Sequence, residues 1–354
     1  MSEFLCQINI LPVGEGDCIH LRFFSDDKWY NIIIDSGPGK MYEDDEEDEE
    51  NEECLPFLKL LRNIEKKGEV VDLLCFTHID DDHIEAARKV FAEYIGLGER
   101  IKEVWLNIPE YEKERTTSKK PGGLQHISAS NALELYRYVR WYEEQNKLVC
   151  KTKVIAGEKF HSGDVKVSVV LPDQFRLDRF EQEWEKQHPR DSALVQISTK
   201  KPSDHSKTNG ASIVLLVEAY GWRMLFTGDT FAVNLCDMIK EQEETGQNTH
   251  YDLVKLPHHG SSANITATML KKLNCKCFAV SADGVERRSQ QRPDQATVDI
   301  LDSYGKAHEG VTLYGNYEWG HITSKEGIQI VKLTEKEIKL TKAISIRTEE
   351  PKCL

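Results

Sequence analysis

The sequence has no apolar run long enough to cross a membrane, because its longest apolar stretches have only the length of a strand. Its first residues also lack the basic segment followed by an apolar stretch that marks a secretory signal. We therefore expect a cytoplasmic protein with no membrane partner.

The sequence also has fewer basic than acidic residues, and its net charge is −14. A globally basic surface for nucleic acid is thereby excluded. Nucleic acid itself is not excluded, because bound metal ions would bring positive charge of their own. Much of the negative charge lies in one run from Glu43 to Glu53, interrupted only by Asn51. A block of like charge with almost no apolar residue predicts a disordered surface loop.

The nine cysteines are scattered and do not form the two matched pairs that a zinc ribbon needs. Cys275 and Cys277 make a single CxC pair in an apolar segment. We interpret the cysteines as the reduced thiols of a cytosolic protein. With 354 residues, 39% of them hydrophobic, the chain is long enough to bury a sizeable core.

Apolar segments of strand length alternate with polar clusters and helical periodicity along the chain. Strands are predicted over 7–11, 17–24, 29–34, 70–76, 212–217, 223–226 and 253–256, and helices over 55–65, 83–95, 132–142 and 174–187. This alternation is typical of an α/β fold, in which sites usually lie where strands end.

The strongest candidate site directly follows the apolar segment 70–76. It reads Thr77-His78-Ile79-Asp80-Asp81-Asp82-His83. Imidazole nitrogens and carboxylate oxygens suit zinc, manganese or iron. A helix cap would explain one aspartate, but not two histidines that flank three aspartates. The segment therefore predicts a metal centre.

Three further polar clusters also follow apolar strands, at Asp35, at Asp229 and at the pair His258-His259. Each alone is typical of an ordinary turn. Beside the first cluster, they predict one shared site at the ends of the strands.

In chain order these clusters resemble the motifs of the metallo-β-lactamase superfamily. A finer resemblance is to the metallo-β-lactamase domain of bacterial DNA-uptake competence proteins. It is carried by Val13-Gly14-Glu15-Gly16-Asp17-Cys18 (VGQGD in that branch), the segment 77–83 (SHxDxDH), Asn209-Gly210-Ala211-Ser212 (NxxS), the segment 225–229 (LLTGD) and the segment 256–261 (LxxHHGS). The competence proteins embed this domain in a membrane channel, and this chain has no channel part.

The resemblance spans Ile8 to about Leu301 and implies a four-layer αββα sandwich with two mixed sheets. It further implies a single domain over 1–354, with insertions near 40–54, 107–147 and 174–206. The acidic run forms the first insertion.

The resemblance also implies two divalent metal ions, Zn2+ or Mn2+. The first ion would be bound by His78 and Asp80, and the second by Asp82, His83 and His259. Asp229 would bridge both ions, and Asp35 would orient a ligand histidine.

The chain departs from the superfamily pattern at the first metal. Asp80 stands where the common motif of the superfamily has a histidine. The competence branch also has an aspartate at this position. The histidine of the third motif is missing, and Asn209 occupies the comparable place as a candidate ligand. The first site is then rich in oxygen, which favours manganese.

The function expected from this site is metal-dependent hydrolysis. The leading candidate is a phosphodiesterase or nuclease that acts on nucleic acid or a nucleotide. A water shared by the two metals would attack the substrate. Asp82 is a candidate acceptor of its proton, and His258 a candidate to contact a phosphate oxygen or protonate the leaving group.

Two alternatives stay open. One is a hydrolase of another ester, amide or thioester, since one fold hosts many reactions. The other is a metal-bearing subunit that binds protein partners in a bacterial defence or signalling system. Lysines in the insertions form either a basic rim for nucleic acid or an ordinary surface; they are Lys113, Lys119, Lys120, Lys200, Lys201 and Lys207.

Overall fold

The strands form two eight-stranded sheets. A computed structural model describes residues 5–39, 55–109, 131–187, 207–287, 289–323, 325–334, 338–341 and 343–348. In spatial order the first sheet is β17 (Ile338–Lys339), β18 (Ile344–Arg347), β1 (Cys6–Ile10), β2 (Ile19–Ser25), β3 (Lys28–Ile34), β4 (Leu73–Phe76), β5 (Glu103–Leu106) and β6 (Val149–Lys151). The second is β16 (Ile328–Lys332), β15 (Val311–Gly315), β12 (Cys277–Val280), β11 (Leu253–Lys255), β10 (Trp222–Phe226), β9 (Val214–Ala219), β8 (Val165–Leu171) and β7 (Lys159–Ser162).

Both sheets are mixed, because β1 pairs antiparallel with β2 but parallel with β18, and β10 pairs antiparallel with β9 but parallel with β11. The other described elements include the helices α3 (Ile95–Gly98), α6 (Gln174–Gln187) and α7 (Lys207–Gly210), two short 3-10 helices (His258–Gly260 and Ser262–Asn264) and the small hairpin of β13 (Glu286–Arg287) and β14 (Gln290–Gln291).

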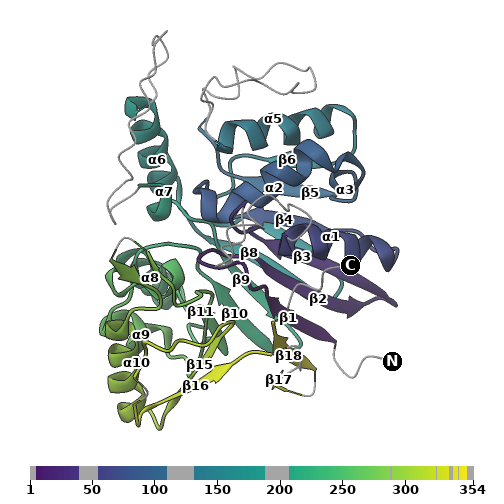
Figure 1. Cartoon of the computed structure of the whole chain (residues 1–354). Coiled ribbons are helices and arrows are strands. Elements are labelled where there is room, and N and C mark those ends of the chain that lie inside the picture. Colours follow the sequence, from purple (N-terminus) through teal and green to yellow (C-terminus); the bar gives the residue numbers. More distant parts are fainter. Residues whose placement is uncertain are drawn as a thin grey trace.

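The helices cover the outer faces of the two sheets (Figure 1). On the first sheet lie α1 (Pro56–Lys66), α2 (Asp81–Glu93) and α5 (Asn131–Glu144), and on the second lie α8 (Ala232–Glu244), α9 (Ala267–Leu273) and α10 (Gln295–Ala307). One apolar core separates the sheets, and one lies beneath each helical layer. The fold is therefore the predicted four-layer αββα sandwich.

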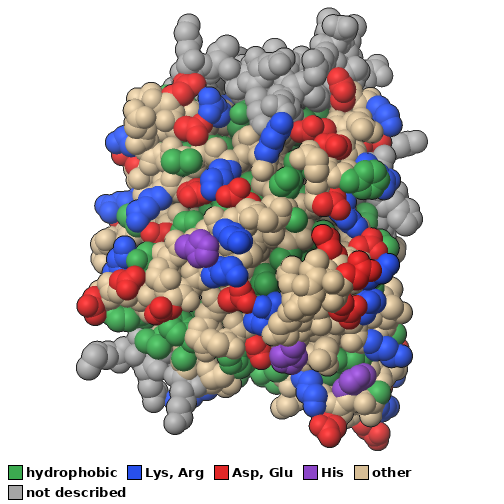
Figure 2. Space-filling view, turned by 180° about the vertical axis from the view of Figure 1, so that it is seen from behind, with side chains coloured by type: hydrophobic (Ala, Val, Ile, Leu, Met, Phe, Trp, Pro, Cys, Tyr) green, Lys and Arg blue, Asp and Glu red, His purple; other side chains and the backbone are tan. Residues whose placement is uncertain are grey.

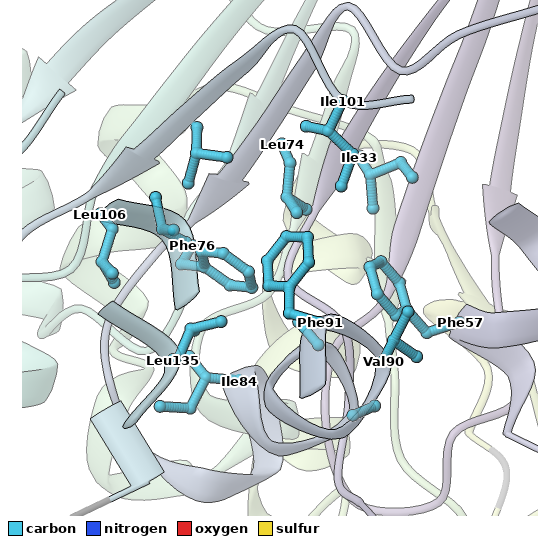
Figure 3. Packing of buried hydrophobic residues seen from close by; sticks show 14 of the residues in the cluster. Ile33, Phe57, Leu74, Phe76, Ile84, Val90, Phe91, Ile101, Leu106 and Leu135 are labelled. Atoms are coloured by element: carbon cyan, nitrogen blue, oxygen red, sulfur yellow. The ribbon is translucent and has the colours of Figure 1, made fainter. Parts of the chain in front are cut away.

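The unbroken apolar run of β4 follows from its position between two cores. Leu73 and Cys75 face the core between the sheets, whereas Leu74 and Phe76 face the helices. Figure 3 shows Leu74 and Phe76 packed with Phe91 of α2. A strand that is buried on both faces has no polar alternation. This packing fixes where β4 ends, and the site begins there.

His20 of β2 is a buried histidine away from the predicted site. Its Nε2 donates to Asn31 Oδ1 at 2.9 Å, because the amide nitrogen of Asn31 already donates to Glu69 and Val70. Burial lowers the pKa of His20 to about 4, and the hydrogen bond to Asn31 opposes this only in part. The folded state therefore rejects a proton that the unfolded chain accepts at its ordinary pKa of 6.5.

Protonation of His20 in the unfolded chain alone therefore favours unfolding at low pH. We expect the free energy of unfolding to be unaffected by His20 above pH ~6.5 and to fall by about 3 kcal/mol as the pH falls towards ~4. His20→Gln keeps a donor and cannot titrate. The loss of unfolding free energy between pH 7 and pH 4, measured with urea, should be smaller in the variant by about that amount. Identical losses in the two proteins would contradict the assignment.

The insertions are described only in part. Residues 40–54 lie outside the described residues, so the acidic run stays a prediction. Within 107–147 the structure describes α5, and within 174–206 it describes α6, which spans the predicted range. The lysines of the predicted basic rim lie outside the described residues, as does the side chain of Lys207.

Among the described residues, no helix is both long enough and apolar enough to span a membrane. Lys and Arg side chains are interspersed with Asp and Glu over the described residues visible in Figure 2. The charge on that face is therefore mixed, in line with the absence of a globally basic surface.

Candidate metal centre

Four strand ends bring the predicted residues to one edge of the sandwich. β3 and β4 are parallel neighbours in the first sheet, and Asp35 and His78 follow them. β10 and β11 are parallel neighbours in the second sheet, and Asp229 and His258-His259 follow them. The two edges meet directly, since the Ile213 amide donates to the Thr77 carbonyl at 2.7 Å.

Asp229 lies at the centre of this cluster. Its Oδ2 is 3.9 Å from His78 Nε2, 3.7 Å from His258 Nε2 and 3.7 Å from His259 Nε2. Its Oδ1 is 3.5 Å from His83 Nε2. One carboxylate therefore faces four imidazole rings.

The other two predicted carboxylates border the same space. Asp82 Oδ2 lies 3.2 Å from His259 Nε2 and 3.8 Å from His83 Nε2. Asp80 Oδ2 lies 3.8 Å from His78 Nε2. All six predicted ligands thus converge. Among these six residues, two sets have ligand atoms within 4.8 Å of one another, namely His78, His83 and Asp229, and Asp82, His83 and His259. Two further sets of this kind include Asp17.

Asp35 fixes the orientation of two of these rings from behind. It is fully buried and has a positive φ of 58°. Its Oδ1 accepts from the Thr77 amide at 2.7 Å, and its Oδ2 accepts from Thr77 Oγ1 at 2.7 Å and from His83 Nδ1 at 2.9 Å. The Thr77 hydroxyl donates its only proton to Asp35. His78 Nδ1 must therefore donate to Thr77 Oγ1, 3.0 Å away. In their neutral forms, both histidines then present an unprotonated Nε2 to the centre.

His259 is oriented in the same way, because its Nδ1 lies 3.1 Å from the carbonyl oxygen of Ser281, which can only accept. In the neutral ring its Nε2 also carries a lone pair. That lone pair faces Asp82 and Asp229, so the centre gathers lone pairs with no proton between them.

Several of these inward-facing atoms have no hydrogen-bond partner in the part of the chain that the structure describes. They are His78 Nε2, His83 Nε2 and Asp229 Oδ1, all buried. Leaving such atoms unpaired is costly, and a cation satisfies them all at once. Nitrogen and oxygen donors of this kind fit zinc or manganese.

Without cations, protons would balance the charge of the buried carboxylates. Burial alone would lower the pKa of His259, but the neighbouring carboxylates of Asp229, Asp17 and Asp82 raise it to about 10. The pKa of His83 is raised for the same reason, against burial, by Asp229 and Asp35. Burial and the neighbouring His83 lower the pKa of His78 to about 3. The centre therefore favours positive charge.

Asn209, the candidate replacement for the missing histidine, lies in α7 with its Oδ1 buried and without a hydrogen-bond partner among the described residues. Three residues later, Ser212 Oγ accepts from the Asp229 amide at 3.3 Å. The segment of Asn209 thus adjoins the centre, and its role as a ligand stays a prediction.

Sequence reasoning missed a buried ion pair behind His259. Lys255 is 1% exposed, and its Nζ donates to Asp17 Oδ2. Asp17 Oδ1 lies 3.6 Å from His259 Nδ1. Burial would raise the pKa of Asp17, but Lys255 and His259 lower it to about 2. A lysine inside the apolar strand β11 and an aspartate in the glycine-rich segment 13–18 were the available signals.

We expect Lys255→Met to lower the free energy of unfolding by about 3–5 kcal/mol, because it leaves the charge of Asp17 buried and unpaired. Lys276→Met removes a pair with Glu309 whose side chains are 56% and 90% exposed, and it should cost less than about 1 kcal/mol. Urea unfolding of both variants tests this. Equal losses would show that Lys255 is not needed to neutralise Asp17.

Comparison with protein-family profiles gives no match, and comparison with curated proteins gives none either. Among solved structures, a variant of the CmlA β-hydroxylase is similar at 15% identity and a TM-score of 0.43, over 87% of this chain and 52% of that one. The chain therefore spans about half of that enzyme. The metallo-β-lactamase fold protein YhfI from Bacillus subtilis has 10% identity and a TM-score of 0.39, over 92% and 95% of the two chains. A diphosphatase of the PhnP family has 11% identity and a TM-score of 0.36, over 90% and 81%.

Proposed function

We propose that the chain is a metal-dependent hydrolase that cleaves phosphodiester bonds in nucleic acid or in a nucleotide. The observation that carries the proposal is the position of Asp229, whose two oxygens face four imidazole rings. Sites for two divalent ions beside one another suit a phosphodiester, because two cations stabilise the attacking and the leaving oxygen together.

The residues of the chain divide this work. His78, Asp80 and Asp229 would bind one ion, and Asp82, His83, His259 and Asp229 the other. Divalent ions bound there would polarise a substrate oxygen and lower the pKa of water, which is the chemistry that such centres supply.

Asp80 and Asp82 mark the side from which substrate enters. Their side chains are both 38% exposed, whereas those of His78, His83 and Asp229 are at most 3% exposed. Burial would raise the pKa of Asp82, but His83 and His259 hold it below its ordinary value. Asp82 is thus ionised at neutral pH, which is the state that a metal ligand or a proton acceptor needs.

The test is a substrate screen on protein stripped of metal and reloaded with Zn2+ or Mn2+. The substrates are bis-p-nitrophenyl phosphate, single- and double-stranded DNA, RNA and cyclic dinucleotides, with a p-nitrophenyl carboxylate ester as comparison. We expect metal-dependent cleavage of a phosphodiester. Turnover of the carboxylate ester alone would favour the other hydrolase class, and no turnover with both ions bound would overturn the enzymatic proposal.

A further inference from the structure

We propose that His258 is a ligand of the first metal and takes the place of the histidine that the third motif lacks. The inference rests on the two-metal centre of the proposed function, but not on its substrate. Sequence reasoning gave His258 another role, as a contact for phosphate or a donor of a proton.

The backbone after β11 directs the rings of both His258 and His259 towards the site. In an extended strand the side chains of neighbours point to opposite faces. Here His258, His259 and Gly260 have consecutive positive φ values of 49°, 51° and 80°. That conformation is unfavourable for the two histidines, and such strain collects at functional sites. It places Nε2 of both rings 3.7 Å from the same oxygen, Asp229 Oδ2.

Asn264 then determines which nitrogen of His258 carries the proton. The Asn264 amide nitrogen donates to the backbone carbonyls of Asp229 at 3.1 Å and Thr230 at 3.2 Å. Since carbonyls only accept, the orientation of this amide is fixed. Its Oδ1 must face His258 Nδ1, 3.0 Å away, and only a protonated Nδ1 can donate to it. The lone pair of Nε2 therefore points into the site.

This arrangement suits a metal ligand, which needs a lone pair on Nε2 and a hydrogen bond at Nδ1. A general acid at this position needs a second proton, on Nε2, and a group close enough to Nε2 to accept it. The 3.7 Å between Nε2 and Asp229 Oδ2 is too long for a hydrogen bond. It is within the span of two bonds of about 2.0–2.2 Å to one cation. The 3.9 Å between His78 Nε2 and Asp229 Oδ2 is also within the span of two such bonds to one cation.

The first metal would then have two imidazole nitrogens, from His78 and His258, and two carboxylates, from Asp80 and Asp229. Such a donor set is less rich in oxygen than the sequence implied, and it suits zinc as well as manganese. Asn209 is then not required as a ligand.

The direct test leaves the chain unchanged. Protein labelled with 15N at histidine is loaded with two equivalents of 113Cd2+, and scalar coupling between cadmium and Nε2 is recorded. We expect coupling to four histidines, His78, His83, His258 and His259. Coupling to three, with His258 absent, would overturn the proposal. A chain that hydrolyses nothing but couples to four histidines would refute the proposed function and leave this inference intact.

Variants supply the second measurement. His258→Ala should bind one Zn2+ as tightly as the wild type and the second at least about 10-fold more weakly. Asn264→Leu removes the acceptor for Nδ1 and should weaken the second ion by about 10- to 100-fold. His250→Ala, at a side chain that is 53% exposed, is the matched control and should bind both ions normally. Two tightly bound ions in His258→Ala, with only the rate lost, would restore the role of proton donor.

Discussion

Asp229→Asn is expected to abolish phosphodiester hydrolysis, with a loss of at least ~10³-fold, and to lower the metal content of the protein. The amide has almost the same shape as the carboxylate but lacks its charge. In the wild type, Asp229 Oδ1 lies 3.5 Å from His83 Nε2, and Oδ2 faces the three other rings at 3.7 to 3.9 Å. Because this one carboxylate borders both ligand sets, its loss should weaken both ions.

The measurement combines metal analysis after dialysis with turnover of bis-p-nitrophenyl phosphate. Asp237→Asn is the matched control, since Asp237 is 61% exposed on α8 and pairs only with Arg176 among the described residues. It should behave as the wild type. An Asp229→Asn protein that retains two ions and full turnover would show that Asp229 does not bridge the metals.

Asp35→Asn should lower metal affinity by about 10- to 100-fold without removing any direct ligand. The wild-type carboxylate accepts from the Thr77 amide, the Thr77 hydroxyl and His83 Nδ1. An asparagine cannot accept at both ends. Its NH2 group faces either the Thr77 amide, or His83 Nδ1 and the Thr77 hydroxyl, and in the second case His83 loses the hydrogen bond that points its Nε2 at Asp229. Either orientation breaks a hydrogen bond that positions Thr77 or His83.

Competition with a chromophoric chelator measures this affinity, and Asp237→Asn again serves as the control. Far-ultraviolet circular dichroism should show that the variant is folded. If folded Asp35→Asn binds both ions as tightly as the wild type, then Asp35 acts only in stability and not in positioning His83.

The elements of the site could be predicted from sequence because they obey local rules. The buried run of β4 predicted a strand with a polar cluster at its end, and parallel strands carry such clusters to a common edge. His78 and Asp229 are therefore brought together as expected. The bounds differ by a few residues. β4 begins at Leu73 and not at 70, and α2 spans Asp81–Glu93 and not 83–95, so Asp82 and His83 lie in its first turn.

The contacts that orient the ligands could not be predicted, because they join segments that have no local relation. Asp17 and Lys255 are 238 positions apart, and only the packing of the two sheets makes them neighbours. Asn264 holds His258 through a hydrogen bond whose direction depends on the backbone carbonyls of Asp229 and Thr230. A pattern of residue types contains no such directional information.

The relationship to the competence branch and the identity of the substrate stay predictions. The distances between side chains define the candidate metal ligands, and they do not identify the substrate. Five of the six lysines expected to form a basic rim lie outside the described residues, as does the side chain of Lys207, so contacts with a long nucleic acid stay a prediction too.

The most direct test of the proposed dinuclear centre is the number of divalent ions bound per chain. Purified protein is reloaded with Zn2+ or Mn2+, dialysed and analysed by inductively coupled plasma mass spectrometry beside Asp229→Asn. The structure predicts two ions per chain in the wild type and fewer than one in the variant. A wild-type protein that retains no ion after reloading, or the same content in both proteins, would contradict the assignment of these residues to a metal centre.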